Sequence, residues 1–232
     1  MTRAQRVSFI VPAHNEAATI ADVLARVEAL DLDKQVVVVD DGSTDATPRI
    51  VEEWANRDGV LLVRQQHRGK GAAIRAAIPL LDGDIAVIQD ADMEYDPAEV
   101  PELIEPIVRG AADVVFGSRL SGGRPQRAYM FWHLVGNRFL SLVTNVLYNT
   151  TLHDMETGYK AFRADVLRSL DLRQDGFGIE PEITAKVCLR GLRVYELPIA
   201  YYGRTYAEGK KITWRDGVQA LAILVRERVA GR

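Results

Sequence analysis

Three acidic side chains crowd into five residues at the end of one apolar run. Residues 85–88 are Ile-Ala-Val-Ile, and Asp90, Asp92 and Glu94 follow almost at once. An apolar run bounded by turn residues predicts a buried strand, so the three carboxyl groups are expected at its carboxyl end. Carboxylates this close repel one another unless a cation lies between them, and Mg²⁺ and Mn²⁺ prefer such oxygen ligands. The motif predicts a divalent metal site, with a solvated acidic turn as the simpler alternative.

Two other predicted strands also lead into acidic residues. The first apolar run of the chain is followed by a loop that contains Glu16, and the second ends at Asp40 and Asp41. Strands that alternate with helices imply a mostly parallel sheet, in which ligands bind at the carboxyl ends of the strands. We therefore expect all of these acids to meet at one edge of the sheet. Helix capping for Glu16 and an ordinary turn for the two aspartates are the alternative interpretations.

The periodicity of apolar residues predicts an α/β fold in which helices cover both faces of a mostly parallel central sheet. Continuous β-branched runs are typical of strands buried on both faces, and Ile20, Leu24 and Val27 recur at helical spacing. Predicted strands cover residues 7–11, 35–39, 60–64, 85–89, 112–116 and 194–200. Predicted helices cover residues 17–30, 46–55, 69–81, 129–148, 180–189 and 214–229.

Length and composition exclude several classes of protein. The chain has 232 residues and a net charge of -3, so nothing indicates nucleic-acid binding. Its one cysteine, Cys188, excludes an intramolecular disulfide and indicates a reducing compartment. The first residues do not form a signal-peptide core, and no apolar run reaches the roughly eighteen residues that span a bilayer. We expect a cytoplasmic protein and leave peripheral contact with the inner face of the cell membrane open.

Two amphipathic segments bear on that membrane question. Residues 129–148 place Phe131, Val135 and Phe139 on one helical face, and residues 214–229 form a second amphipathic helix near the end of the chain. A helix in the core or at an interface is the simpler interpretation of the first segment, and a helix lying on a membrane surface is the alternative. Both segments are expected to take part in any contact with a membrane or with a membrane partner.

Five short motifs occur in a fixed order along the chain. They are Val-Pro-Ala-His-Asn-Glu at 11–16, Val-Asp-Asp-Gly-Ser-Thr-Asp at 39–45, Gly-Lys-Gly at 69–71, Asp-Ala-Asp at 90–92 and Gly-Ser-Arg at 117–119. In this order and at strand ends, they resemble the family-2 glycosyltransferases, whose GT-A fold is a Rossmann-like α/β domain.

Two later segments, 154–160 and 204–211, narrow the resemblance to dolichol-phosphate mannose synthases and bacterial polyprenyl-phosphate glycosyltransferases. The resemblance implies a single domain over residues 1–232. Residues 1–120 would form its nucleotide-sugar-binding half, and residues 121–232 its acceptor-binding half with the C-terminal amphipathic helix.

The resemblance implies that the first half binds a nucleotide sugar together with Mg²⁺ or Mn²⁺. Asp92 would bind the metal on the diphosphate, Asp90 would contact the ribose or the sugar, and Lys70 would neutralise phosphate. Glu94 stands where relatives often carry glutamine, and it is either a second metal ligand or a surface acid. The other residues expected to line the donor site are Pro12, Ala13, Asn15, Glu16, Asp40, Asp41 and Ala91.

The resemblance also implies an acceptor phosphate on a polyprenyl or dolichyl chain. Arg119 and Arg204 are the expected phosphate-binding cations, because arginine forms paired hydrogen bonds with phosphate oxygens. The lysines at 210–211 would assist or would face lipid head groups. Some relatives carry an arginine near residues 132–133, where this chain has tryptophan and histidine, which leaves part of the acceptor site undefined.

The expected reaction is an inverting displacement that moves a hexose from a donor of the GDP-mannose or UDP-glucose type. A phosphate acceptor is already anionic at neutral pH and needs no general base, whereas a hydroxyl group of a saccharide, small molecule or protein does. Candidates for that base are Asp154, Glu180 and Glu182, each of which could instead stabilise a helix start or a loop. Transfer to a hydroxyl group is the alternative function. The residues expected to take part in the reaction are Asp90, Asp92, Arg119, Arg204 and Asp154.

Overall fold

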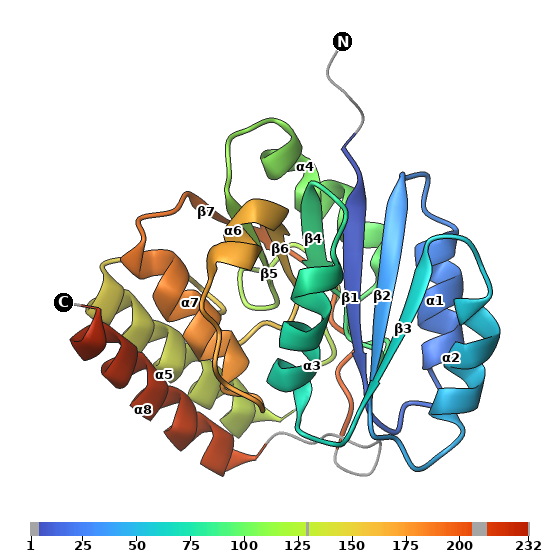
Figure 1. Cartoon of the computed structure of the whole chain (residues 1–232). Coiled ribbons are helices and arrows are strands. Elements are labelled where there is room, and N and C mark those ends of the chain that lie inside the picture. Colours follow the sequence, from blue (N-terminus) through green and yellow to red (C-terminus); the bar gives the residue numbers. More distant parts are fainter. Residues whose placement is uncertain (1–4, 129, 206–212, 232) are drawn as a thin grey trace.

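A seven-stranded sheet in the order β3-β2-β1-β4-β6-β5-β7 runs through the molecule (Figure 1). The computed structural model describes residues 5–128, 130–205 and 213–231. The strands are β1 (Val7–Ala13), β2 (Lys34–Asp41), β3 (Val60–Gln65), β4 (Ile85–Ile88), β5 (Val114–Ser118), β6 (Lys160–Arg163) and β7 (Val194–Pro198). Only β6 runs antiparallel to its neighbours, β4 and β5. The predicted single α/β domain with a mostly parallel sheet is confirmed.

Helices cover both faces of this sheet, as predicted. One face packs against α1 (Ile20–Glu28), α2 (Thr47–Ala55) and α4 (Val100–Val108). The other face packs against α3 (Lys70–Ala77), α5 (Phe131–Tyr148), α6 (Ala164–Ser169), α7 (Ile179–Leu189) and α8 (Trp214–Ala230). Two short 3-10 helices, η1 (Ile78–Leu80) and η2 (Pro97–Glu99), complete the set in the described residues.

Burial on both faces explains why the strands read as continuous apolar runs. In β1, Phe9 and Val11 belong to the core on the α1 side, and Ile10 belongs to the core on the α3 side. Successive side chains of a strand point to opposite faces, so a sheet that is covered twice needs apolar residues at every position. All three residues are fully buried.

Three elements were missed by the sequence-based prediction, namely α4, β6 and α6. The α4 segment contains Pro101 and Pro106, and proline inside a helix removes a backbone hydrogen bond. Pro101 sits in the first turn, where its missing N–H is not needed, and Leu103 and Ile107 bury the helix against the sheet. Packing therefore outweighs propensity here. β6 and α6 are short, with four and six residues.

Several predicted boundaries are wrong by a few residues. The first predicted helix, 17–30, begins only at Ile20, and the helix predicted over 69–81 ends at Ala77 and continues as η1. The strand predicted over 112–116 is displaced to Val114–Ser118, and the last one ends at Pro198. The strands β1, β2 and β5 each end two residues later than predicted, so Asp40 and Asp41 belong to β2 itself, but the candidate site still lies at the carboxyl ends of the strands.

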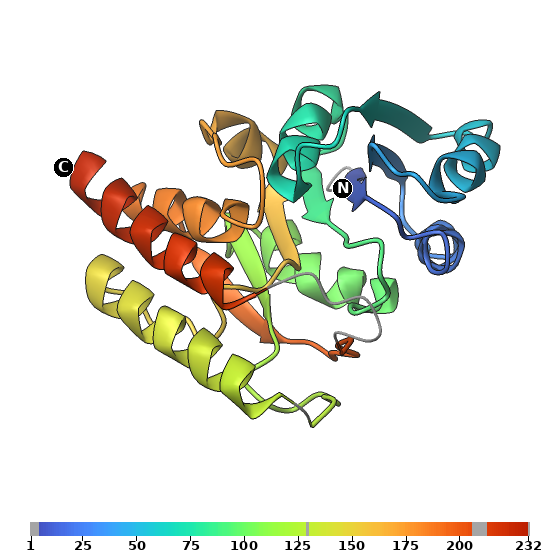
Figure 2. The ribbon, with the colours of Figure 1, turned by 90° about the horizontal axis from the view of Figure 1, so that it is seen from below.

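Helices α5 and α8 lie side by side on the outside of the molecule, beyond α7 (Figure 2). The hydroxyl of Tyr148 donates a hydrogen bond of 2.6 Å to the backbone oxygen of Leu224, which ties the two helices together. Only Leu140, Ser141 and Thr144 of α5 are buried, and this side of the helix packs against α7 and α8, which fits the interface form of the simpler interpretation. No helix of the described residues is both long enough and apolar enough to cross a membrane.

Candidate active site

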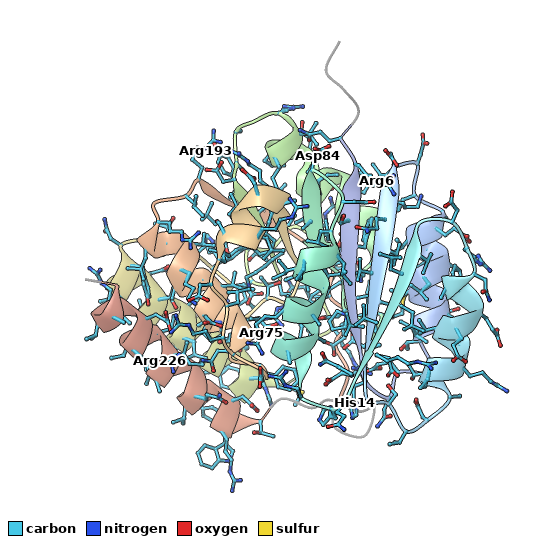
Figure 3. All side chains as sticks on the ribbon, viewed as in Figure 1. Arg6, His14, Arg75, Asp84, Arg193 and Arg226 are labelled. Atoms are coloured by element: carbon cyan, nitrogen blue, oxygen red, sulfur yellow. The ribbon has the colours of Figure 1, made fainter. Side chains whose placement is uncertain are left out.

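A cavity of about 940 Å³ opens where the parallel strands end. Figure 3 shows His14, which lines it, at this end of the sheet, with Arg6 and Asp84 at the opposite end. The loops after β1, β3, β4 and β5 and the first turns of α3, α5 and α7 form much of its wall. Predicted site residues in this wall are Pro12, Ala13, Asn15, Glu16, Asp41, Lys70, Asp90, Ala91, Asp92, Glu94, Arg119 and Arg204. Two predicted residues, Asp40 and Asp154, do not line the cavity.

Asp41 organises the loop that follows β3. Its buried carboxylate accepts hydrogen bonds from the side chain of Gln65 at 2.6 Å and from the backbone N–H groups of Arg68 at 2.9 Å and Gly69 at 2.7 Å. Burial alone would raise the pKa of Asp41, but the bonds from Gln65, Arg68 and Gly69 lower it below its usual value. Asp41 is therefore charged and fixes the backbone that leads into α3.

The loops after β1 and β2 are joined by polar contacts. Asn15 has a positive φ of 55°, and its side-chain oxygen accepts a hydrogen bond of 2.8 Å from the backbone N–H of Thr44. The carboxylate of Asp40 accepts one of 3.0 Å from the backbone N–H of Ser43, as in the ordinary turn considered above. These contacts hold Pro12 and Ala13 in the wall of the cavity.

Two histidines stack at the same end of the cavity. The rings of His14 and His67 lie 4.0 Å apart, and the Nδ1 atoms are 2.8 Å from the backbone oxygen and from the carboxylate of Asp41, respectively. In the described ranges, this is the one group of three potential metal ligands whose atoms lie within 4.8 Å of one another. Because each oxygen of the Asp41 carboxylate already accepts two hydrogen bonds, the group is better suited to holding the loops than to binding a metal.

Arg204 lies among the acids that follow β4. Its guanidinium group is 2.6 Å from Asp92 and 2.9 Å from Glu16, and its backbone N–H donates to Glu94 at 2.7 Å. The left-handed φ of 61° at Met93 turns the chain so that the backbone N–H of Glu94 reaches the carboxylate of Asp92. Residues far apart in the sequence thus meet at one point. The lysines at 210–211 fall outside the described residues.

The crowding of these acids changes the protonation of Asp92. Burial, and then the charges of Asp90 and Glu94, raise the pKa of Asp92 to about 7, although Arg204 acts in the opposite direction. The positive charge of Arg204 therefore offsets only part of the negative charge that gathers around Asp92. The acidic end of the cavity can therefore accommodate further positive charge.

Lys70 connects the acidic end of the cavity to α7. Its ammonium group lies 2.7 Å from the carboxylate of Asp90 and 2.9 Å from that of Glu180. Burial alone would lower the pKa of Lys70, but Asp90 and Glu180 raise it well above its usual value. Gly158 allows this close packing, because a Cβ atom there would lie 2.6 Å from Asp90 and 2.7 Å from Lys70.

Arg119 and Asp154 form a buried ion pair. The Arg119 side chain donates two hydrogen bonds to the Asp154 carboxylate, at 2.6 Å from Nε and 2.7 Å from Nη2, and its backbone N–H adds a third at 3.0 Å. Asp154 is completely buried, whereas Arg119 reaches the wall of the cavity. The geometry places Arg119 near a ligand and Asp154 behind it.

The three candidates for a general base differ in position. Asp154 is engaged by Arg119, and the buried carboxylate of Glu182 accepts hydrogen bonds from the backbone N–H groups of Arg173 and Gln174. Neither residue lines the cavity. Glu180 does line it, and one of its oxygens bonds Lys70.

Sequence reasoning missed Glu156, His67 and Tyr95, which also line the cavity. Burial, and then the neighbouring Glu180, raise the pKa of Glu156 to about 8. Tyr95 directly follows Glu94, and His67 comes two residues after β3, so both lie at strand ends where the site was expected, whereas Glu156 reaches the site through the packing of a distant segment. For Glu156, the one signal in the sequence was its position inside the segment 154–160.

Comparisons with known proteins define the class to which this fold and cavity belong. Residues 8–171 match the family described as Glycosyl transferase family 2. The glycosyltransferase AglJ of Haloferax volcanii is 32% identical over 201 residues, which cover 85% of this chain and 63% of the relative. The chain thus spans less than two thirds of the length of that protein. The undecaprenyl-phosphate mannosyltransferase of Micrococcus luteus is 32% identical, over 88% of this chain and 87% of its own.

A solved structure with the same fold is glucosyl-3-phosphoglycerate synthase from Mycobacterium tuberculosis, in complex with Mn²⁺, UDP and glucosyl-3-phosphoglycerate. Its TM-score is 0.73 at 21% identity, and the match covers 97% of this chain and 80% of that protein. The chain belongs to glycosyltransferase family 2. The resemblance stated from the motifs is confirmed.

Proposed function

We propose that this protein is an inverting, metal-dependent hexosyltransferase that uses a nucleotide sugar and transfers the hexose to a polyprenyl or dolichyl phosphate. One observation carries the proposal: a single cavity brings the acids Asp92 and Glu94 together with the cations Lys70, Arg119 and Arg204. A diphosphate donor and a phosphate acceptor both require cations, and the acids suit a divalent metal. The name of the Micrococcus luteus relative, an undecaprenyl-phosphate mannosyltransferase, supports this acceptor.

The acidic end of the cavity fits Mg²⁺ or Mn²⁺. Asp92 and Glu94 offer hard oxygen ligands, and burial together with the charges of Asp90 and Glu94 raises the pKa of Asp92, an effect that a bound cation would oppose. When bound, the metal ion supplies positive charge beside the diphosphate of the donor. Asp92 and Glu94 are the residues proposed to hold it, in competition with the guanidinium group of Arg204.

The positions of the acids favour an acceptor that is already anionic. A hydroxyl acceptor needs a base within hydrogen-bond reach, but Asp154 and Glu182 lie outside the cavity wall and accept hydrogen bonds from elsewhere in the chain. Glu180 is held by Lys70. A phosphate oxygen needs no base, and Arg119 and Arg204 are proposed to hold it by paired hydrogen bonds. Asp154 is proposed to fix the orientation of Arg119.

Contact with a membrane surface forms part of the proposal, because a polyprenyl chain is insoluble in water. The first turn of α5 contributes His133 and Leu134 to the cavity wall, and neighbouring Phe131 and Trp132 are 65% and 78% exposed. Trp214, at the start of α8, is 75% exposed. Large exposed apolar side chains beside a lipid-binding cavity are suited to a membrane interface.

The proposal is tested by turnover. A panel of sugar nucleotides, including GDP-mannose and UDP-glucose, is incubated with Mg²⁺ or Mn²⁺, with and without undecaprenyl phosphate. Release of nucleoside diphosphate and the appearance of a sugar-lipid are followed by mass spectrometry. We expect one donor to react only when the lipid is present. Reaction with a hydroxyl acceptor and no lipid would refute the polyprenyl phosphate and support the alternative function.

A further inference from the structure

Two carboxyl groups in the cavity wall have oxygens with no hydrogen-bond donor. Glu180 is 6% exposed, and its Oε1 atom contacts Lys70, but its buried Oε2 atom accepts no hydrogen bond from any residue that the structure describes. The same holds for the Oε1 atom of Glu156. Buried carboxylate oxygens are normally satisfied, because an unmet hydrogen bond destabilises the fold. Two such atoms in one wall suit a ligand that brings its own donors.

The charge around these two residues selects a neutral ligand. The cations Lys70, Lys160 and Arg119 face the carboxylates of Asp90, Asp154 and Glu180. Glu156, with its pKa of about 8, keeps its proton at neutral pH and adds no charge. Because positive and negative charges balance here, neither a cationic nor an anionic ligand would gain electrostatic energy by binding. Hydroxyl groups, in contrast, donate and accept hydrogen bonds without carrying charge.

The pair also lies beyond Asp90 when the wall of the cavity is followed from the two histidines. His14 follows β1 and His67 follows β3, and their rings stack, while Asp90 follows β4, the neighbour of β1 on its other side. Glu156 precedes β6, which is the next strand again, and Lys70 links Asp90 to Glu180. A ligand that extends from the histidines across Asp90 therefore brings its far end to Glu156 and Glu180.

We propose that Glu156 and Glu180 bind hydroxyl groups of the hexose on the donor, and that they select which hexose is transferred. This inference rests on the proposed function, since it requires a nucleotide sugar in the cavity. The neutral carboxyl group of Glu156 both donates and accepts, and Glu180 accepts through Oε2. A site that binds a hydroxyl group strongly rejects a sugar in which that group is missing or misplaced, because its own polar atoms then stay unpaired.

The test compares the affinity of the nucleoside diphosphate with that of the nucleotide sugar, measured by isothermal titration with Mn²⁺. In the wild-type protein, the ratio of the two affinities reports the contribution of the sugar. We expect Glu156→Ala and Glu180→Gln to reduce this ratio by about tenfold, the effect of one lost hydrogen bond to a sugar. Glu156→Gln keeps a neutral group that donates and accepts, and should retain most of the ratio.

Glu182→Gln is the matched control. Glu182 lies on the same helix two residues after Glu180, but it does not line the cavity. The Glu182→Gln variant should keep the wild-type ratio of the two affinities, even if its thermal unfolding temperature is lower. If Glu180→Gln does not fold, Glu156→Ala decides the question.

Equal weakening of diphosphate and nucleotide sugar in the variants, or an unchanged ratio, would overturn the hexose site while leaving the transferase intact. A wild-type protein that binds no nucleotide sugar would instead refute the proposed function. The two failures are therefore distinguishable.

Discussion

Asp154 illustrates how burial assigns a role to a single residue. Its carboxylate is completely buried and holds Arg119 through three hydrogen bonds. Removal of one partner of a buried pair leaves the other charge uncompensated, which typically costs about 3–5 kcal/mol. We predict that Asp154→Asn lowers the free energy of unfolding by about 3 kcal/mol, measured by urea denaturation.

Asp165→Asn is the control for this prediction. It removes the same charge from another arginine pair, between Arg163 and Asp165, but the Asp165 side chain is 63% exposed. Exposed pairs contribute roughly 0–1 kcal/mol, so the stability should hardly change. A fully stable but inactive Asp154→Asn protein would contradict the positioning role and return Asp154 to the list of candidate bases.

Glu156 predicts a specific dependence of stability on pH. Burial, and then Glu180, raise the pKa of Glu156 to about 8 from the ordinary 4.5. Between these values the unfolded chain loses the proton while the folded chain keeps it. The free energy of unfolding therefore falls as the pH rises through this window, and Glu156 stabilises the fold fully only below about pH 4.5.

The substitution Glu156→Gln removes this titration and keeps the shape of the side chain. Between pH 5 and pH 9, the free energy of unfolding of the wild-type protein should fall by about 3 kcal/mol more than that of the variant. This figure is below the full effect that a pKa difference of this size would produce. Urea denaturation of both proteins at the two pH values measures this difference. Parallel pH profiles would show that Glu156 is ionised in the folded protein.

At the level of elements, residues 199–205, which follow β7, reach the acidic end of the cavity. They include Arg204, which lies 2.6 Å from Asp92 and 2.9 Å from Glu16. A metal ion that uses Asp92 must compete with this guanidinium group. We predict that Arg204→Ala binds Mn²⁺ at least about tenfold more tightly in the absence of donor and acceptor, because a neighbouring positive charge is removed.

Electron paramagnetic resonance of unbound Mn²⁺ measures this affinity directly. Arg26→Ala is the control, since Arg26 pairs with Asp96 near the surface at 3.3 Å. The same Arg204 variant should lose most of its lipid-dependent turnover if Arg204 also holds the acceptor phosphate. Weaker Mn²⁺ binding in Arg204→Ala would exclude competition between the arginine and the metal.

The strands β1, β2 and β4 could be predicted from the sequence because each is buried on both faces and therefore consists of an apolar run. The edge strand β3 is only partly buried, and the apolar residues 60–63 were enough to predict it. The elements that escaped prediction have weaker local signals. The prolines of α4 oppose a helix, and only its packing against the sheet stabilises it. β6 has four residues and runs antiparallel, which the surrounding βαβ pattern does not indicate. Long-range packing decides such elements.

At the scale of the whole molecule, the site was predictable to the extent that its residues sit in motifs at strand ends. The co-location of Glu16, Asp92 and Glu94 follows from the geometry of parallel strands. The partner of Arg204 could not be read from the sequence, because 112 positions separate Arg204 from Asp92 along the chain. Glu156 and Glu180 likewise meet only through tertiary packing, and they carry the proposal on sugar selection.

We propose that the paired helices α5 and α8 extend the site into a surface for lipid. Phe131, Trp132 and Trp214 are largely exposed and lie at the ends of α5 and α8 that approach the cavity. An aromatic side chain that enters a membrane interface gains free energy, so their replacement by serine should weaken binding to lipid vesicles. We predict that the triple variant sediments with phosphatidylglycerol vesicles at least about tenfold less than the wild-type protein, given the apolar area removed.

Turnover separates this effect from damage to the cavity. The triple variant should lose activity on undecaprenyl phosphate in vesicles but retain its affinity for the nucleotide sugar, because none of the three residues lines the cavity. Replacement of Leu61 and Leu80, which are 43% and 41% exposed on other elements, by serine is the matched control. Unchanged sedimentation of the triple variant would mean that another surface meets the membrane. Equal losses in the control would mean that general exposure of apolar groups, rather than the α5 and α8 surface, causes the binding.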